Sequence, residues 1–335
     1  MHTGQHYDDA LSRVFVEELE VGRPQHMLDV GSGSHAVQTA RVMERLAPVL
    51  ERERPDVVLV PGDVNSTLAA ALAAVKLRVP VAHLEAGLRS YDPRMPEEHN
   101  RLLTDHIADI LLTHSESAQA NLEREGIDAS RIHFVGNTMI DSLFTFLERA
   151  RGLEPWKAFD AEPGGYGLVT LHRPSLVDDD EALHLTAIAL ADLSETTPIV
   201  FPVHPRTAAR LGASGDARLL EDAGVRIVGP VGYLDFVGLQ AEAAFVLTDS
   251  GGVQEETSAL GVRCFTLRDS TERPVTVDLG TNTVLGAEPG RIAEIPALLA
   301  EPRESREIAL WDGHAGDRAA DVLIEFVAGA RMAVG

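Results

Sequence analysis

VVLV, at residues 57–60, and VPVAHL, at residues 79–84, are apolar runs of strand length, and the helix-forming residues 68–76 separate them. Residues 110–113 and 132–135 continue the alternation after amphipathic helical stretches. Near-continuous apolar strands between amphipathic helices are typical of parallel strands that helices cover on both faces. This part of the chain therefore predicts a doubly wound α/β domain.

The alternation stops at residues 152–167, where Pro, Gly, Trp and acidic residues predict a linker, and then it starts again. Further strands are predicted at residues 168–171, 199–203, 225–228, 244–248 and 263–267. Two such halves in succession favour two Rossmann-like parallel-sheet domains that face a central cleft. We expect the first domain at residues 1–158, joined by a C-terminal helix in residues 318–335, and the second at residues 159–317.

The 335 residues carry a formal net charge of −23 at pH 7, which argues against nucleic-acid and anionic-lipid partners. An acidic protein can still hold an anionic nucleotide where arginines and helix N-termini reverse the local field. The single cysteine, Cys264, excludes an internal disulfide and is predicted to be a buried strand residue. No apolar run has the length of a membrane span and no signal peptide is visible, so we expect a cytoplasmic protein.

Acidic residues follow the first two strands, at the sheet edge where open α/β folds bind their ligands. Asp63 either caps the next helix or takes part in chemistry. Glu85 stands directly after a buried strand, a costly place for a charge, which favours a functional role. Glu97 opens a helix after Pro96, where the helix dipole alone would also favour an acid. Together Asp63, Glu85, Glu97 and the adjacent Glu98 are a candidate acid/base cluster.

The second half has the features of an anion site. Ser250-Gly251-Gly252 follows a strand and opens a helix, so its backbone N–H groups can approach a phosphate closely. Glu256, one turn further on, either reaches a ribose hydroxyl pair or is merely solvated. His172-Arg173 and His204-Pro205-Arg206 add cations at two more strand ends.

Other kinds of site are not supported by the sequence. It contains no P-loop, no dinucleotide fingerprint and no G-x-S-x-G elbow. His99 and His106 lie two turns apart on one predicted helix, too far to share a metal ion without other ligands. We therefore expect no metal.

Nine motifs along the chain resemble, in order, those of the non-hydrolysing UDP-N-acetylglucosamine 2-epimerases. They are Thr3-Gly4-Gln5-His6, Pro61-Gly62-Asp63-Val64-Asn65-Ser66-Thr67, His83-Leu84-Glu85-Ala86-Gly87-Leu88-Arg89, Pro96-Glu97-Glu98-His99-Asn100-Arg101, Val135-Gly136-Asn137-Thr138, Leu171-His172-Arg173-Pro174, Pro202-Val203-His204-Pro205, Thr248-Asp249-Ser250-Gly251-Gly252-Val253-Gln254-Glu255-Glu256 and Arg268-Asp269-Ser270-Thr271-Glu272-Arg273-Pro274. Each motif is weakly specific, but the ordered set is highly specific.

The resemblance implies a GT-B-like fold, a homodimer, and interconversion of UDP-GlcNAc and UDP-ManNAc without a cofactor. It implies that the sugar chemistry is carried out by Asp63, Glu85 and Glu97, and that Arg101 and His172 contact or assist the diphosphate. The positions that it implies for UDP binding are Ser250, Gly251, Gly252, Glu256 and Arg273. We add four candidate substrate-binding residues, which are Gln5, His6, His204 and Arg206.

In the family, another strand and a Gly-Thr-Arg-Pro-Glu loop precede the Thr-Gly-Gln-His motif, whereas this sequence starts at that motif. We expect the natural chain to begin upstream. The alternatives are an epimerase for a modified sugar such as a UDP-diacetamido-uronic acid, a hydrolysing epimerase that releases ManNAc and UDP, a GT-B glycosyltransferase, and a non-catalytic UDP-sugar-binding protein.

Overall fold

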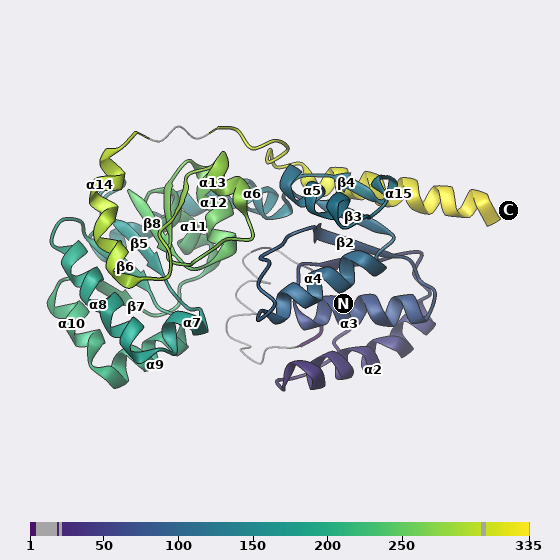
Figure 1. Ribbon diagram of the computed structural model, residues 1–335, viewed down its shortest axis with the longest axis horizontal. Coiled ribbons are helices and arrows are strands. Elements are labelled where there is room, and N and C mark those ends of the chain that lie inside the picture. The colour runs from purple at the N-terminus through teal and green to yellow at the C-terminus, as the bar shows by residue number, and fades with distance from the viewer. Residues whose placement is uncertain (5–18, 20–21, 303–305, 335) are drawn as a thin grey trace. The chain divides into compact units, whose positions relative to one another are not determined.

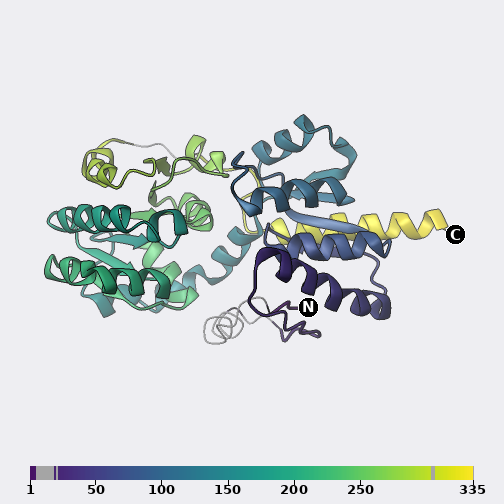
Figure 2. The same cartoon turned by 60° about the horizontal axis from the view of Figure 1, so that its bottom comes forward.

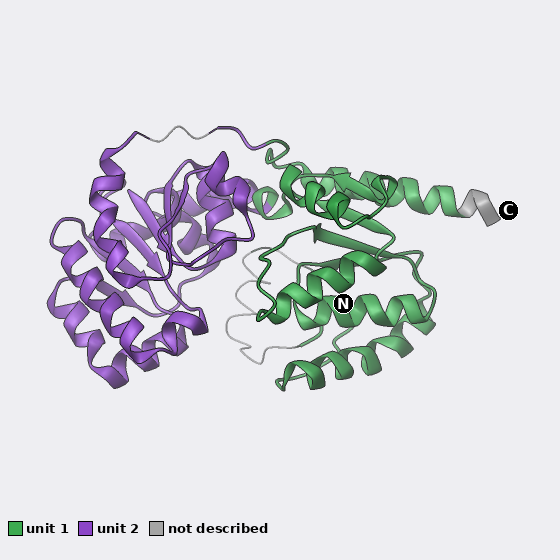
Figure 3. Ribbon diagram, in the orientation of Figure 1, with its two compact units in different colours: residues 1–141, 309–335 green, residues 142–308 purple. Residues whose placement is uncertain are grey.

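The chain forms two compact units. The computed structural model describes residues 1–4, 19, 22–302 and 306–334, with residues 331–334 described by their backbone alone. Unit 1 comprises residues 1–141 and 309–335, and unit 2 comprises residues 142–308 (Figure 3). Each unit is built on its own sheet of parallel strands flanked by helices (Figure 1). The predicted fold class, α/β with two Rossmann-like parallel-sheet domains, is therefore confirmed.

Unit 1 contains a four-stranded parallel sheet in the order β1-β2-β3-β4. Its strands are β1 (Val58–Pro61), β2 (Val81–Ala86), β3 (Ile110–Thr113) and β4 (Ile132–Phe134). Its helices are α2 (His35–Glu53), α3 (Asn65–Lys76), α4 (Pro96–Ile107), α5 (Glu116–Arg124), η1 (Ala129–Arg131) and α15 (Ala315–Val334). The C-terminal helix α15, yellow in Figure 2, packs Ala319, Val322 and Phe326 against the side chains of Ile110 and Leu112.

Small residues allow close packing at two places in unit 1, along α3 and just after β2. Alanines of α3, among them Ala69, Ala71 and Ala74, are fully buried in the core of the unit. Gly87, just after β2, has a φ of +84°, and a Cβ there would lie 2.3 Å from the Ala118 carbonyl oxygen. Only glycine fits at this position. The chain can therefore turn tightly after β2 and carry the next residues back over the sheet edge.

Unit 2 contains a six-stranded parallel sheet in the order β10-β9-β8-β5-β6-β7. Its strands are β5 (Gly167–Thr170), β6 (Ile199–Pro202), β7 (Arg226–Val228), β8 (Phe245–Thr248), β9 (Arg263–Thr266) and β10 (Asn282–Val284). Its helices are α6 (Thr138–Gly152), η2 (Pro155–Phe159), α7 (Pro174–Val177), α8 (Asp180–Ser194), α9 (Pro205–Ser214), α10 (Asp216–Asp222), α11 (Tyr233–Ala241), α12 (Gly251–Leu260), α13 (Pro274–Asp278), η3 (Pro289–Glu294) and α14 (Ile295–Ala300). Because the strand order reverses between β5 and β8, the topological switch point of the sheet lies there.

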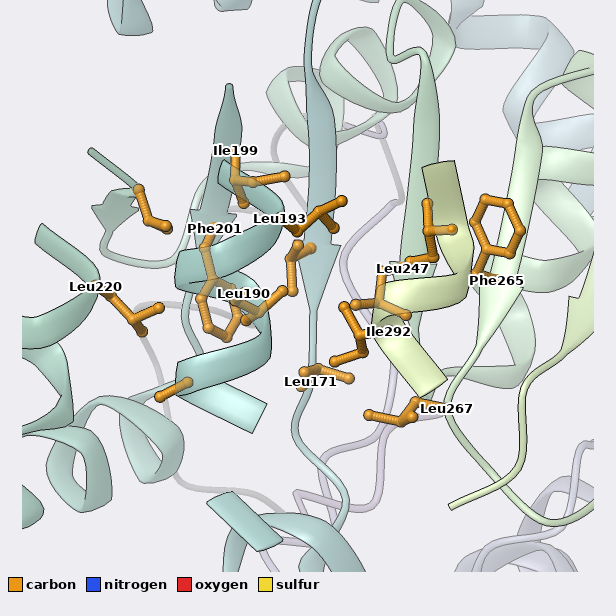
Figure 4. Packing of buried hydrophobic residues seen from close by; sticks show 14 of the residues in the cluster. Leu171, Leu190, Leu193, Ile199, Phe201, Leu220, Leu247, Phe265, Leu267 and Ile292 are labelled. Atoms are coloured by element: carbon orange, nitrogen blue, oxygen red, sulfur yellow. The ribbon is translucent and has the colours of Figure 1, made fainter. Parts of the chain in front are cut away.

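The core of unit 2 is aliphatic and aromatic. Figure 4 shows Leu190 of α8, Phe201 of β6 and Leu247 of β8 among the buried side chains that fill the layer between helices and sheet. Cys264 lies buried in β9, as the sequence predicts.

The predicted linker at residues 152–167 is wrong. Trp156 and Tyr166 from this stretch are buried in the core of unit 2, and the Tyr166 hydroxyl donates a hydrogen bond to the Leu239 carbonyl oxygen. The division between the two units falls between residues 141 and 142, within α6. Pro and Gly mark chain turns here, but the two aromatic residues need burial and draw the stretch onto the sheet.

Among the described helices, none has the length and apolarity that crossing a membrane would require.

Candidate active site

The carboxyl ends of β1 and β2 bring Asp63 and Glu85 to the same edge of the unit 1 sheet. The two strands are neighbours, with Pro61 opposite Leu84. A Cβ built on Gly62 would lie 4.0 Å from Oε2 of Glu85, so this carboxylate approaches the loop that carries Asp63. Parallel strands place residues that follow them in one row, which is why residues 22 positions apart in sequence become neighbours.

Glu85 holds an unusual backbone conformation. Its φ is +68°, a region that a non-glycine residue occupies at a cost of about 1 kcal/mol. The β2–β3 register shifts between Leu84 and Ala86, so Glu85 is the extra residue of a bulge. Bulges and left-handed non-glycine residues gather at functional sites, where they redirect a side chain. Here the bulge takes the partly buried side chain of Glu85 out of the regular alternation of side chains along β2.

Arg101 of α4 links Asp63 to a second carboxylate. Its guanidinium lies 2.8 Å from Oδ2 of Asp63 and 2.6 Å from Oε2 of Glu98. The neighbouring Asn100 donates a hydrogen bond of 2.8 Å to the Asp63 carbonyl oxygen. The Asp63 loop is therefore fixed to α4 through both its side chain and its backbone.

Glu97 and Glu98, adjacent in sequence, differ in their surroundings. Glu98 is buried and accepts hydrogen bonds from the backbone N–H groups of Ser90 and Tyr91. Burial alone would raise the pKa of Glu98, but these bonds and the charge of Arg101 hold it below its usual range. Glu97 is only partly buried, and its side chain forms no hydrogen bond or ion pair with the described residues. The partners of Glu98 thus hold it as an anion, whereas the Glu97 side chain is available to a ligand.

In unit 2 the switch point of the sheet brings together His172, which follows β5, and Asp249, which follows β8. Oδ1 of Asp249 lies 3.0 Å from Nδ1 of His172, and Oδ2 accepts hydrogen bonds of 2.8 Å from the backbone N–H groups of His172 and Arg173. Burial alone would raise the pKa of Asp249, but its bonds to His172 hold it low. The His172 side chain is 43% exposed, so its imidazole is oriented by a buried carboxylate and open on its other side.

Three arginines crowd around Glu272. Arg268 binds Glu272 through two hydrogen bonds of 2.9 and 3.0 Å, and Arg173 and Arg273 lie 3.6 and 3.8 Å from it. Burial alone would raise the pKa of Glu272, but the bonds from Arg268 and the nearby cations hold it at about 2. Burial and the charge of Arg268 lower the pKa of Arg173. Guanidinium groups held this close favour the approach of a further anion.

Arg273 lies against the first turn of α12. A Cβ on Gly251 would lie 2.3 Å from Nη1 of Arg273, so the missing side chain makes room for the guanidinium. Nε of Arg273 lies 3.0 Å from Oε1 of Glu255. Gln254 accepts hydrogen bonds from Thr271 and Asn282, which fix the loop before α13 and the strand β10 to α12. A cation and a helix N-terminus thus converge on one spot, which is an anion-binding arrangement.

Glu256 is buried one turn into α12. The Tyr233 hydroxyl donates a hydrogen bond of 3.4 Å to its Oε1. Burial raises the pKa of Glu256 from 4.5 to about 7, and the charge of Glu255 adds to the rise. Near neutral pH this carboxyl group therefore exists in both protonation states, as a donor or as an acceptor.

The remaining predicted site residues lie apart from these contacts or outside the described residues. His204 accepts a hydrogen bond from the Arg206 backbone N–H at the start of α9, and its ring centroid is 6.4 Å from that of His172. The Arg206 guanidinium binds Asp178, so it can reach a ligand only by leaving that carboxylate. Gln5 and His6 lie outside the described residues.

A family model described as UDP-N-acetylglucosamine 2-epimerase matches residues 1–324. The chain belongs to the UDP-N-acetylglucosamine 2-epimerase family. As a member of this family it is an enzyme, and the resemblance predicted from its motifs is confirmed.

Three relatives of this epimerase-family chain are particularly informative. The UDP-N-acetylglucosamine 2-epimerase of Methanocaldococcus jannaschii is 41% identical over 329 residues, which are 96% of this chain and 90% of the relative. The crystal structure of the M. jannaschii UDP-GlcNAc 2-epimerase in complex with UDP-GlcNAc and UDP has a TM-score of 0.87 at 40% identity and covers 97% of this chain and 91% of that one. The UDP-2,3-diacetamido-2,3-dideoxy-D-glucuronate 2-epimerase of Pseudomonas aeruginosa is 43% identical over 303 residues, 88% of this chain and 81% of the relative.

Replacing Glu256 with glutamine should make this epimerase-family chain more stable at pH 8. Because the folded-state pKa of about 7 lies above the unfolded value of 4.5, the neutral carboxyl group favours folding. This contribution is complete below about pH 4.5 and is lost as the pH rises through about 7. At pH 8 the glutamine variant should therefore exceed the wild type by about 3 kcal/mol. Urea unfolding without nucleotide measures this difference.

The same comparison at pH 5 is the internal control, because folded Glu256 is protonated there and the difference should shrink to below about 1 kcal/mol. A difference in stability that is equal at pH 5 and pH 8 would show that Glu256 does not titrate in this way.

The sequence did not single out several residues that form contacts in or next to this site. They are His83, Arg89 and Asp105 in unit 1, and Gln254, Glu255, Arg268 and Glu272 in unit 2. A signal existed for His83, because it interrupts an apolar strand, and for Arg268 and Glu272, because they lie in a matched motif. Most of their pairings join separate elements, which no sequence window contains, although Arg268 and Glu272 lie only four residues apart.

Proposed function

We propose that this chain interconverts UDP-N-acetylglucosamine and UDP-N-acetylmannosamine by eliminating UDP and adding it back. The observation that carries the proposal is Glu85, a carboxylate held at positive φ in a bulge beside the Asp63 loop. A backbone strain of this kind is retained where the side chain is needed. Family membership and a relative solved with UDP-GlcNAc and UDP support the substrate class.

The proposal divides the work between the units. Asp63, Glu85 and Glu97 of unit 1 act on the sugar. In unit 2, α12 with Gly251 and Gly252, together with Arg273, holds the diphosphate, and Glu256 holds the ribose. The oriented imidazole of His172 and the cation of Arg101 assist the leaving diphosphate.

The chemistry follows from the position of the hydrogen that must move. The C2–H of the sugar is not adjacent to a carbonyl, so direct removal is difficult. Breaking the C1–O bond first, with the electron pair leaving on UDP, gives an oxocarbenium-like centre that acidifies C2–H. A carboxylate takes that proton, and 2-acetamidoglucal and UDP remain bound. Returning a proton to the opposite face of C2 and re-forming the C1–O bond inverts C2.

Incubating the protein with UDP-GlcNAc and no added cofactor, and separating the products, tests this function. We expect UDP-ManNAc in equilibrium with the substrate. Free ManNAc and UDP as the main products would move the chain to the hydrolysing class. Binding of UDP-GlcNAc without any turnover would make it a UDP-sugar-binding protein.

A second candidate substrate is a UDP-diacetamido-uronic acid, favoured by the P. aeruginosa relative. The carboxylate of such a sugar calls for one more cation near the carboxylates of unit 1. Within the described part of unit 1, the cations close to that edge already have partners, since Arg101 binds Asp63 and Glu98 while Arg89 binds Asp105 and Glu125. We therefore place the N-acetyl sugar first. Comparing kcat/KM for the two substrates decides between them.

A further inference from the structure

His83 of β2 is fully buried beneath the carboxylates of unit 1. Its Nδ1 lies 2.6 Å from Oδ1 of Asp105 on α4, and its Nε2 lies 2.8 Å from the Gly62 carbonyl oxygen. Asp105 is also fully buried. The imidazole therefore joins the middle of the sheet to a helix on one side and to the β1–α3 loop on the other.

Both partners of the His83 ring are hydrogen-bond acceptors. A carbonyl oxygen accepts only, and Asp105 also receives Arg89 at 2.7 Å and the Gly87 backbone N–H at 3.2 Å, so it is a carboxylate. A neutral imidazole has one N–H and can satisfy only one of two acceptors, whereas an imidazolium satisfies both. Burial alone would lower the pKa of His83, but Asp105, the Gly62 carbonyl group and the charge of Glu85 raise it above its usual value.

The charged and polar groups around His83 belong to the elements that pack against it. Asp105 belongs to α4, Gly62 to the β1–α3 loop, and Glu85 to the bulge two residues along its own strand. Arg89 reaches the ring only through Asp105, and Glu125 of α5 pairs with Arg89. His83 and Arg89 are the cations of this group, Asp105 and Glu125 are their carboxylate partners, and Glu85 adds a further negative charge that favours the imidazolium.

We propose that His83 is a positioning residue of the reaction, a permanently charged imidazolium that fixes Gly62, and hence Asp63, and keeps Glu85 ionised. The inference rests on the proposed function, because it assigns work to the carboxylates that act on the sugar. His83 itself touches no substrate, and it acts through Asp63 and Glu85.

The charge is measured directly, on the wild-type protein and without any activity assay. In a sample with 15N-labelled histidine rings, the His83 signals, identified by their loss in H83Q, should show both nitrogens protonated throughout roughly pH 6 to 8. A His83 ring that carries a single proton at pH 7 overturns the proposal.

Two near-isosteric variants test the positioning role. The amide nitrogen of H83N takes the place of Nδ1 and can still donate to Asp105, while that of H83Q takes the place of Nε2 and can still donate to Gly62. Both variants lack the positive charge, so each should lose about 10- to 100-fold in kcat with UDP affinity unchanged. Losing a neighbouring cation raises the pKa of a carboxylate. The acidic limb of the pH–rate profile should therefore move about one pH unit upward in both variants.

His106→Gln is the matched control, since His106 is exposed on α4 next to Asp105 and should leave rate and profile unchanged. If the wild type is inactive on UDP-GlcNAc, the proposed function fails, whatever the ring signals show. If the wild type is active and the acidic limb of the pH–rate profile is the same in H83N and H83Q, the positioning role is overturned and His83 is structural. Retained UDP binding in the variants shows that they are folded.

Discussion

Replacing Glu85 with glutamine will lower kcat by about two to four orders of magnitude while UDP binds as before. The amide keeps the size of the side chain but can neither take nor return a proton. UDP affinity should not change because Glu85 is not among the groups proposed to bind UDP. Initial rates with UDP-GlcNAc and calorimetric titration with UDP measure the two quantities on the same preparation.

Two further variants separate the chemistry from the fold. Glu51→Gln removes an exposed carboxylate of α2 and should leave kcat unchanged. Glu85→Gly relieves the positive φ of this position, so it should be inactive yet within about 1 kcal/mol of the wild type in stability. An active Glu85→Gln protein would remove Glu85 from the mechanism.

Replacing Gly251 with alanine will weaken UDP binding by about 10- to 100-fold. The added methyl group would lie 2.3 Å from Nη1 of Arg273, so the guanidinium must move away from the first turn of α12. A hydrogen bond to a charged group contributes about 1.5–3 kcal/mol, which sets the size of the expected loss. Titration with UDP measures it, and the fold should survive because a side-chain end, not backbone, is displaced.

Gly212→Ala is the control for this substitution. Gly212 lies within α9 of the same unit, and a Cβ there meets nothing within 4 Å. This variant should bind UDP as the wild type does and be slightly more stable, because alanine favours the helix. Unchanged UDP affinity in Gly251→Ala would contradict the placement of the diphosphate at α12 and Arg273.

The fold could be predicted because apolar periodicity is a local signal. The strand expected at residues 110–113 is observed there, and the others shift by one or two residues, as at β1 and β2. The strand β10 (Asn282–Val284) was missed because three residues with two polar members give no pattern. The stretch around Trp156 was misjudged because turn residues were weighed above its aromatic residues.

The site could be predicted only in part. Residues at or just after the ends of strands, such as Glu85, Asp63 and His172, were found because parallel topology alone sends them to the ligand edge. Pairings between elements were not predicted, as when Arg101 pairs with Asp63 and His83 with Asp105. Asp249 was noticed only as the residue before Ser250, although it orients His172. Such pairings depend on side-chain geometry, which spacing in the sequence does not encode.

The central claim is that C2 loses and regains its proton while UDP leaves and returns. Incubating the protein with UDP-GlcNAc in deuterated water, and reading C2 of both sugars by NMR, tests it most directly. The account predicts one deuterium at C2 of UDP-ManNAc and its later appearance in the remaining UDP-GlcNAc. UDP-ManNAc that forms with hydrogen retained at C2 would contradict the elimination route.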